Sequence, residues 1–520
     1  MAESMAYAHK AGIDLAVWLP AVASGGAGSF SMTNYAPRIM RRDFEPGFFV
    51  DHFIKDMGLA LDQCTKMGLS LPGLALCQSL FLALRAQGHG AKGIQAIVLA
   101  LEEINRITIP TAEVTMPSPA AAAPAAAAAA AAAKRVVNLS AGPATLDDTA
   151  MTEAASNFLD HKNSGMSMME MSHRDAGGPV QTAMANASDS VRDLLEVPDD
   201  YHVLWMQGGA HAQFAATIMN TLGSKKSVDV VQSGYWSERF KLSEAERYCD
   251  VGVAWSGESN GYTKHAPVSE WNVNPDSAFV HMCLNETVQG VEYHYDPKLP
   301  GTPGDGSPFL VCDATSTLMS RPMAIENYGI VFASAGKNLG PAGSTCVIVK
   351  DALLGNAADI CPSVIDYTKQ AASLPISSIY NTPPTYNLYM TSLVLDAYQK
   401  RGGLEKIQQN GLDRSQRIYE IIDQSNGLFS NNVEHGSRSR MTIPFQIADG
   451  ADPALAAEFQ RAGAEAGIEQ LLLHPLFPGL RITMYNGLAD SDFDIVEGFM
   501  HQFVTDHSTF SVASPAAAMR

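Results

Sequence analysis

FASAGKNLGPAGSTCVIVK, residues 332–350, places a lysine between two apolar runs that read as strands. Lys337 directly follows the first predicted strand and shares its loop with Gly336, Gly340 and Gly343. Partial desolvation at such a position favours a neutral amine, which can form a Schiff base, and the glycines let a ligand approach the backbone closely. On this motif alone, an ordinary loop lysine beside a turn is the alternative interpretation.

Apolar runs on both sides of this segment alternate with helical segments. The predicted strands cover residues 201–207, 228–234, 277–283, 309–315, 329–335 and 344–350. Because these runs are apolar without strict alternation, they predict an α/β fold with a mostly parallel sheet buried on both faces. After about residue 390 the pattern changes. Long helices over 387–401 and 404–425, followed by two short strand-like runs, predict a smaller α+β domain.

A carboxylate is predicted at the same edge of the sheet as the lysine. Asp313 ends the strand-like run FLVCDATST, 24 residues before Lys337. Ligands of open α/β sheets bind at the carboxyl ends of the strands. A carboxylate that keeps a pyridine nitrogen protonated, opposite an imine-forming lysine, is what a pyridoxal 5'-phosphate (PLP) site requires. A solvated aspartate at a strand end is the alternative.

A third element could bind the phosphate of such a cofactor. In MQGGAHAQFAATIMNTL, Gly208 and Gly209 follow a strand and lead into a helix. The free backbone N–H groups and the dipole at a helix N-terminus attract anions. Taken alone this is a weak signal, since most Gly-Gly turns before helices bind nothing.

Composition excludes several classes of protein. The 520 residues carry 35 Lys+Arg against 54 Asp+Glu, a formal net charge of −19, which argues against nucleic acid and anionic membranes as partners. Seven scattered cysteines without a CxxC pair favour reduced thiols, and we expect no metal site. No secretory signal or transmembrane run is recognised, so a cytoplasmic location is expected. Residues 2–22 already read as an amphipathic helix, which indicates a missing upstream part and leaves an organelle open if a targeting segment is missing too.

The alanine-rich segment divides the chain. Between Ala120 and Ala133 there are 13 alanines interrupted only by Pro124, which offer no large side chains for a core and indicate a tether. Upstream of it, three apolar helical segments predict an all-α module. The predicted organisation is an all-α module (1–108), an Ala/Pro-rich linker (109–134), a large PLP-binding domain (135–390), a small domain (391–507) and a tail (508–520).

From Val137 to about Phe503 the chain resembles the phosphoserine aminotransferases. The resemblance implies the PLP-dependent transferase fold type I, a homodimer with shared active sites, and amino transfer from phosphoserine to 2-oxoglutarate in serine biosynthesis, with glutamate as product. The matching motifs, in order along the chain, are NLSAGPATL, MEMSHRDAGG, QGGAHAQF, GYWSE, NETVQGVE, CDATSTLMSRP, GKNLGPAG, CPSVIDY, YNTPPTYN, SRSRMTIPFQ and LRITMYN.

The same resemblance assigns roles to individual residues. It implies Lys337 as the catalytic lysine that binds PLP covalently, with Asp313 on the pyridine nitrogen and Trp236 stacked on the ring. Thr287 would meet the phenolate oxygen, and Arg481 the substrate α-carboxylate. The cofactor-binding set that it implies is Gly209, Ala210, His211, Trp236, Thr287, Asp313, Gly336 and Lys337, together with Asn381 and Thr382 from the other subunit.

The sequence departs from the family where the substrate phosphate is expected to bind. Gly336 stands where the family usually has Gln, His211 where it often has Arg, and His474-Pro475 where it has His-Arg. Arg174, His474 and His211 remain, and a histidine is only partly charged near neutral pH. The hypothesis is weaker or pH-sensitive binding of phosphoserine. A related transaminase with an unphosphorylated hydroxy-amino acid donor is the alternative.

The first 108 residues resemble the C-terminal helical domain of the β-hydroxyacid dehydrogenases, the group of 3-hydroxyisobutyrate dehydrogenase and tartronate-semialdehyde reductase, and the matching run covers residues 24–72. By that resemblance Lys55 and Asp56 form the motif near the nicotinamide. No G-x-G-x-x-G follows a strand upstream, so a truncated gene model or a decayed fusion kept for dimerisation is the favoured interpretation. A bifunctional hydroxyacid reductase–transaminase whose Rossmann half is missing from this chain is the alternative. A non-catalytic assembly protein is a third, against which Lys337 and Asp313 argue.

Overall fold

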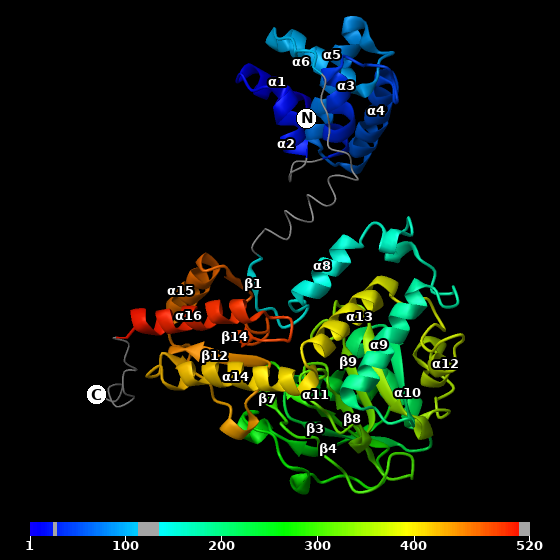
Figure 1. Cartoon of the computed structure of the whole chain (residues 1–520), viewed down its shortest axis with the longest axis vertical. Coiled ribbons are helices and arrows are strands. Elements are labelled where there is room, and N and C mark those ends of the chain that lie inside the picture. The colour runs from blue at the N-terminus through cyan, green and yellow to red at the C-terminus, as the bar shows by residue number, and fades with distance from the viewer. Residues whose placement is uncertain (24–28, 113–134, 509–520) are drawn as a thin grey trace. The chain divides into compact units, whose positions relative to one another are not determined.

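A computed structural model describes residues 1–23, 29–112 and 135–508 of the chain (Figure 1). The chain divides into two units, Met1–Ala133 and Lys134–Arg520. Most of the predicted linker, from residue 113 to 134, lies outside the described residues, as does the predicted tail from residue 509.

The described part of the N-terminal unit is helical, which confirms the predicted all-α module. The predicted single helix over residues 2–22 is wrong. Gly12 adopts a positive φ of 78°, which ends the first helix. The side chain of Asp14 then accepts a hydrogen bond from the N–H of Ala16 at 2.9 Å, and a second helix begins there. The α-helices are α1 (Ala2–Lys10), α2 (Leu15–Ala23), α3 (Ala36–Met40), α4 (Val50–Met67), α5 (Pro72–Leu84) and α6 (Ile97–Asn105).

A seven-stranded sheet forms the centre of the second unit, in the order β2-β10-β9-β8-β5-β3-β4. Only β10 runs antiparallel to its neighbours, so the prediction of a mostly parallel sheet is confirmed. Six of these strands were predicted and β4 was not. The strands are β2 (Tyr201–Met206), β3 (Ser227–Gln232), β4 (Asp250–Ser256), β5 (Phe279–Cys283), β8 (Phe309–Asp313), β9 (Tyr328–Ser334) and β10 (Thr345–Lys350).

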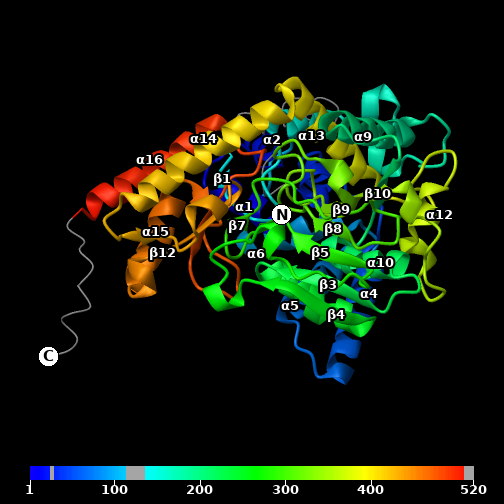
Figure 2. The same ribbon diagram turned by 90° about the horizontal axis from the view of Figure 1, so that it is seen from below.

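Both faces of this sheet are buried, because successive apolar residues of each strand point to opposite sides. On β10, Cys346 and Ile348 pack into one core, and Val347 and Val349 into the other. The helices α9 and α13 lie side by side over the first face, and α10 and α11 cover the second (Figures 1 and 2). Their bounds are α9 (Pro179–Leu195), α10 (Gly209–Thr221), α11 (Tyr235–Ser243) and α13 (Thr385–Lys400).

A second, smaller sheet is built from the last part of the chain. It has the order β11-β12-β14 and is packed by α14, α15 and α16 around its own hydrophobic core. The first strand of the unit, β1 (Val137–Asn138), pairs in parallel with β13 (Ile468–Glu469), so the beginning of the unit packs with this smaller sheet. The bounds are β11 (Phe429–Ser430), β12 (Thr442–Ile447), β14 (Leu480–Thr483), α14 (Gly403–Asp423), α15 (Pro453–Glu465) and α16 (Asp490–Asp506).

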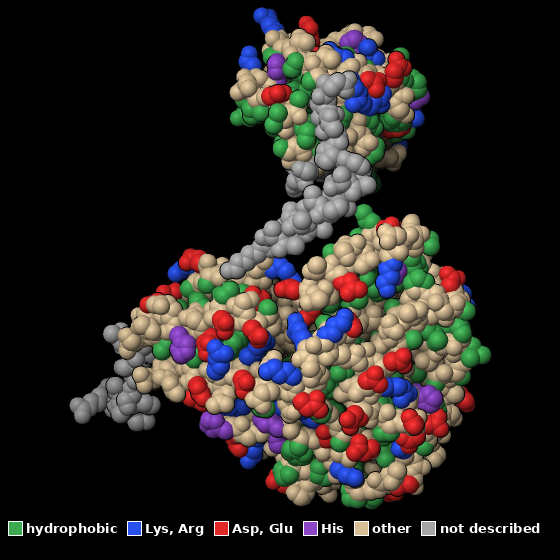
Figure 3. Space-filling view, in the orientation of Figure 1, with side chains coloured by type: hydrophobic (Ala, Val, Ile, Leu, Met, Phe, Trp, Pro, Cys, Tyr) green, Lys and Arg blue, Asp and Glu red, His purple; other side chains and the backbone are tan. Residues whose placement is uncertain are grey.

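Smaller elements complete the second unit: β6 (Asn285–Glu286), β7 (Val291–Glu292), α8 (Asp148–Ser156) and α12 (Tyr367–Ala371). On the face shown in Figure 3, acidic and basic side chains are interspersed over this unit. Among the residues that the structure describes, no helix combines the length and apolarity needed to cross a bilayer.

Candidate active site

A cavity of about 470 Å³ lies at the ends of the central strands, where β8 and β9 leave the sheet. Of the residues predicted for the site, the structure brings ten together around this cavity. They are Gly209, Ala210, His211, Trp236, Thr287, Asp313, Gly336, Lys337, His474 and Arg481.

The N-terminus of α10 forms one end of the cavity. The chain leaves β2 and turns through Gly208 and Gly209, with φ of 92° and 66°. A Cβ on Gly208 would lie 2.5 Å from the Cβ of Ala212, so only glycine allows so tight an entry into the helix. The first N–H groups of α10 are therefore directed at the cavity, where they can bind an anion.

Asp313 and Lys337 are held at the ends of neighbouring parallel strands. Asp313 is the last residue of β8 and is buried, and its Oδ1 accepts a hydrogen bond from the N–H of Thr315 at 3.0 Å. Burial raises the pKa of the Asp313 carboxyl, while the nearby Lys337 and His211 act in the opposite direction. Lys337 follows β9, and its Nζ donates to the Oγ of Ser316 at 2.6 Å.

Trp236 forms a wall of the cavity from the first turn of α11. Its indole N–H donates to the Oγ1 of Thr287 at 3.0 Å, and the Nζ of Lys337 lies 5.9 Å from the centre of the indole. The backbone N–H of Trp236 donates to the buried carboxylate of Glu286 at 2.8 Å. One hydrogen bond thus holds the indole of Trp236 and another holds its backbone.

An arginine and two histidines also line the cavity. Arg481 belongs to β14, and burial lowers the pKa of its guanidinium. The ring of His474 lies 5.0 Å from that of Tyr235 and 6.1 Å from that of Trp236. Desolvation lowers the pKa of His474, as do the charges of Arg481 and Arg239. His211 is affected in the same way, by desolvation and then by Arg239.

Three predicted site residues lie elsewhere in the chain. Arg174 is exposed in the loop before α9 and does not line the cavity. The Oδ1 of Asn381 accepts a hydrogen bond from Gln370 at 2.9 Å, and the carbonyl of Thr382 accepts one from Gln207 at 2.7 Å. Gln207 stands next to the turn that starts α10, so Thr382 lies near the anion-binding end without reaching the cavity.

Several residues at the site were not singled out from the sequence. Ser316 and Glu286 are the most informative, since they hold Lys337 and Trp236 in place. The loop around Gly142 also lines the cavity, and the N–H of Ala144 donates to the carbonyl of Gly336 at 2.9 Å. These residues lie within the family motifs NLSAGPATL, NETVQGVE and CDATSTLMSRP, but the resemblance to the family assigned no role to them.

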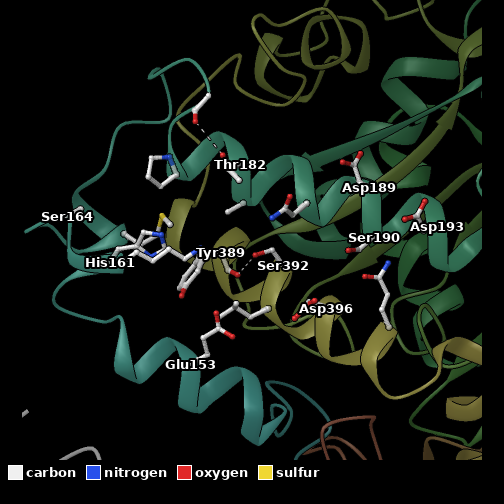
Figure 4. A pocket seen from close by; sticks show the side chains of 18 residues that line it. Glu153, His161, Ser164, Thr182, Asp189, Ser190, Asp193, Tyr389, Ser392 and Asp396 are labelled. Carbon is white, nitrogen blue, oxygen red and sulfur yellow. Dashed lines mark hydrogen bonds between the residues drawn. The ribbon is translucent and has the colours of Figure 1, made fainter. Parts of the chain in front are cut away.

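A larger cavity, of about 740 Å³, lies between α8, α9 and α13 (Figure 4). Figure 4 shows its lining, which includes the carboxylates of Glu153, Asp189, Asp193 and Asp396. Such a lining repels a phosphate-bearing ligand. Size alone therefore does not identify the site, and the smaller cavity has the suitable chemistry.

Comparison with known proteins finds a matching family model for each of the two parts of the chain. The model of the class-V aminotransferase family matches residues 136–475, and that of the NAD-binding domain of NADP-dependent 3-hydroxyisobutyrate dehydrogenase matches residues 1–101. Phosphoserine aminotransferase from Nitrosomonas europaea is 38% identical over 381 residues, which is 72% of this chain and 100% of that protein. The chloroplastic phosphoserine aminotransferase 1 of Arabidopsis thaliana is 37% identical and covers 72% and 84%.

A solved structure agrees with this. PLP-bound phosphoserine aminotransferase from Trichomonas vaginalis superposes with a TM-score of 0.65 at 32% identity, covering 71% of this chain and 100% of that one.

The residues of the cavity fit PLP. The N-terminus of α10 suits its phosphate, and the buried carboxylate of Asp313 gains a charge-assisted partner in a protonated ring nitrogen. Lys337 offers an amine within the same cavity. The expected PLP-dependent enzyme fold and cofactor are thus confirmed. The chain belongs to the class-V aminotransferases and, among them, to the phosphoserine aminotransferase family.

Proposed function

We propose that the chain transfers the amino group of phosphoserine to 2-oxoglutarate, giving 3-phosphohydroxypyruvate and glutamate. The observation that carries this proposal is the single cavity that contains an amine, a buried carboxylate, an anion-binding helix N-terminus and an arginine. Curated relatives that this chain matches along most of their length are phosphoserine aminotransferases, which supports the choice of substrate.

Each of the main residues of the cavity has a separate role in the proposed reaction. PLP, when bound, supplies an electron sink for the bond that breaks at the substrate α-carbon. The Nζ of Lys337, held by Ser316, accepts the α-proton as general base. The carboxylate of Asp313 stabilises positive charge on the ring nitrogen, and Arg481 binds the α-carboxylate of the amino acid. The wall formed by Trp236 excludes water from one side.

A panel of half-reactions tests the substrate. Purified enzyme mixed with phosphoserine, serine, alanine or glutamate is monitored by the visible absorbance of its cofactor. Phosphoserine and glutamate are expected to convert the absorbance fastest, because each carries a second anionic group that the arginine and histidines of the cavity can bind. Fast conversion by serine and none by phosphoserine would refute the proposed donor.

The alternative donor, an unphosphorylated hydroxy-amino acid, is favoured by one observation. Apart from the arginine that binds the α-carboxylate, the cavity offers a substrate phosphate two histidines, His211 and His474, whose pKa values are lowered. Serine as the fastest donor in the panel would support this alternative.

The phosphoserine KM is expected to depend on pH through His474. The pKa of this imidazole lies below its ordinary value of 6.5, chiefly because of desolvation, so its charge is lost at a lower pH than that of a free histidine. The phosphate is mostly a dianion above about pH 6 and binds a protonated imidazole best. KM should therefore rise in the wild type as pH increases through the lowered pKa of His474.

The variant His474→Gln supplies the comparison, because it removes the titration and keeps a polar side chain. Its KM should be high and flat over the same range. A flat profile in the wild type would show that the histidine does not bind the phosphate.

We propose a homodimer in which Arg174, Asn381 and Thr382 serve the partner's cavity. All three lie outside the cavity of their own chain, and the segments that carry them expose apolar side chains, among them Leu159 and Leu374, which are 72% and 84% exposed. Large exposed apolar groups of this kind mark interfaces. The mass in solution tests the dimer.

For the N-terminal unit, the alternative of a bifunctional reductase rests on the match of residues 1–101. Lys55 pairs with its neighbour Asp56 at 3.0 Å, and both side chains are exposed rather than gathered in a site. Transamination is therefore the activity proposed for the chain. Oxidation of NADH with tartronate semialdehyde would favour the bifunctional alternative.

We propose a location in the cytoplasm. All seven cysteines are free thiols, as in a reducing compartment. Since one relative is named as chloroplastic, an organelle is the alternative, and cell fractionation distinguishes the two.

A further inference from the structure

The N-terminus of α11 is capped by side chains from a distant loop. Gly234 precedes the helix and has no side chain to accept a hydrogen bond. Instead, the Oε1 of Gln289 accepts the N–H of Tyr235 at 3.0 Å. The carboxylate of Glu286 accepts the N–H groups of Trp236 at 2.8 Å and Ser237 at 2.9 Å. Three of the first-turn donors that a helix leaves unsatisfied are thus paired by the loop 286–289, and the fourth, the N–H of Gly234, donates to the hydroxyl of Ser237 at 3.2 Å.

The same carboxylate also accepts the hydroxyl of Ser237 at 2.6 Å. The next residue of the loop, Thr287, accepts the indole N–H of Trp236 at 3.0 Å. Neighbouring residues of one loop therefore fix both the backbone and the ring of Trp236, the residue that faces Lys337 across 5.9 Å.

The fit between loop and helix leaves no free space. A Cβ on Gly234 would lie 2.8 Å from the side chain of Glu286 and 2.7 Å from that of Gln289. The loop is itself anchored to the segment before β12, because Arg440 donates to Glu292 at 3.0 Å and Ser439 donates to Asn285, also at 3.0 Å. The cap is rigid enough to set the position of the helix.

Glu286 is fully buried, and an isolated buried charge destabilises a fold. Burial, and to a smaller degree Asp313, raise its pKa to about 7 despite three hydrogen bonds that lower it. The other titratable groups that face it are Cys283, Tyr262 and Tyr293, none of which is a cation. Stability alone does not explain a carboxylate at this place, since an uncharged side chain would avoid that desolvation penalty.

We infer that Glu286 is a positioning residue, whose carboxylate holds Trp236 over the cavity opposite Lys337. A carboxylate is required because it accepts all three hydrogen bonds, whereas the amide of glutamine has one acceptor and would turn its NH₂ group towards an N–H donor. This inference deepens the proposed function and rests on it for the role of the indole beside PLP.

The test compares the holoenzyme of Glu286→Gln with that of Glu238→Gln. The control removes the same charge from the first turn of the same helix, where Glu238 takes no part in the cap. Induced circular dichroism in the visible band of the cofactor reports how the ring is held, and steady-state kinetics report catalysis. For Glu286→Gln we expect a weakened dichroism and a kcat lowered about 10²-fold, with KM for 2-oxoglutarate changed far less. The control should match the wild type in all three.

The pH profile separates positioning from a merely structural role. The dichroism of the wild type should weaken as pH falls through about 7, because the protonated carboxyl loses acceptor capacity, and that of Glu286→Gln should be flat. Wild-type dichroism and kcat in Glu286→Gln would overturn the inference.

If Glu286→Gln does not fold, Glu286→Asp decides. It keeps the charge but shortens the reach, so intermediate dichroism supports the inference and wild-type dichroism overturns it. Failure of the proposed function is distinguishable, since a different amino donor would leave these dichroism differences unchanged.

Discussion

Replacement of Lys337 by alanine is expected to abolish turnover while the protein remains folded. In the proposed mechanism Lys337 supplies both the covalent link to PLP and the base for the α-proton, and proton transfer alone contributes about 10²- to 10⁴-fold to the rate. Its side chain is only half-buried and donates one hydrogen bond, to Ser316, so little packing is lost. The measurement is kcat with phosphoserine, together with the visible absorbance of the lysine-bound cofactor.

Two comparisons make this result specific. Lys400→Ala removes an exposed lysine that pairs with Asp396 at 2.6 Å and does not line the cavity, so this variant should keep full activity. Added methylamine should restore part of the activity of Lys337→Ala, because a free amine can take the proton that the side chain no longer takes. Wild-type turnover in Lys337→Ala would refute the assignment of the active site.

The sequence predicts the central sheet well, and the exception is instructive. Strands such as β8 and β10 are buried throughout and therefore read as continuous apolar runs. β4 lies at the edge of the sheet, where only Ala254 is buried, so its sequence lacks that signal. In the N-terminal unit, hydrophobic spacing predicts helix correctly but does not show the break at Gly12, which depends on a positive φ.

The candidate site also contains residues that the sequence predicts and residues that it does not. Asp313 and Lys337 could be predicted from position alone, because residues at the ends of neighbouring parallel strands meet at one edge. Thr287 required the resemblance to a family, since a threonine inside a loop has no distinctive pattern. Glu286 and Ser316 were missed because their importance lies in contacts with Trp236 and Lys337, which are distant in sequence.

Replacement of Asp313 by asparagine is expected to reduce kcat by about 10²- to 10³-fold, the range seen when one preorganised electrostatic group is removed. Asparagine has nearly the same shape, so the hydrogen bond from the N–H of Thr315 can persist, and the change is chiefly one of charge. Without a carboxylate at this buried position, a ring nitrogen in contact with it loses the partner that keeps it protonated. The measurement is kcat for the overall reaction, with the affinity for PLP determined separately.

An analogue of the cofactor distinguishes loss of charge from loss of structure. PLP methylated on the ring nitrogen carries a permanent positive charge and does not need a carboxylate to maintain it, so it should recover part of the activity of Asp313→Asn. The same analogue should not improve the wild type. Asp276→Asn, at an exposed position, is the matched control and should behave as the wild type. A buried carboxylate such as that of Asp313 is costly, which argues that its charge has a function. If Asp313→Asn turned over at the wild-type rate with ordinary PLP, the reaction would not need this charge, and Asp313 would not be the partner of the ring nitrogen.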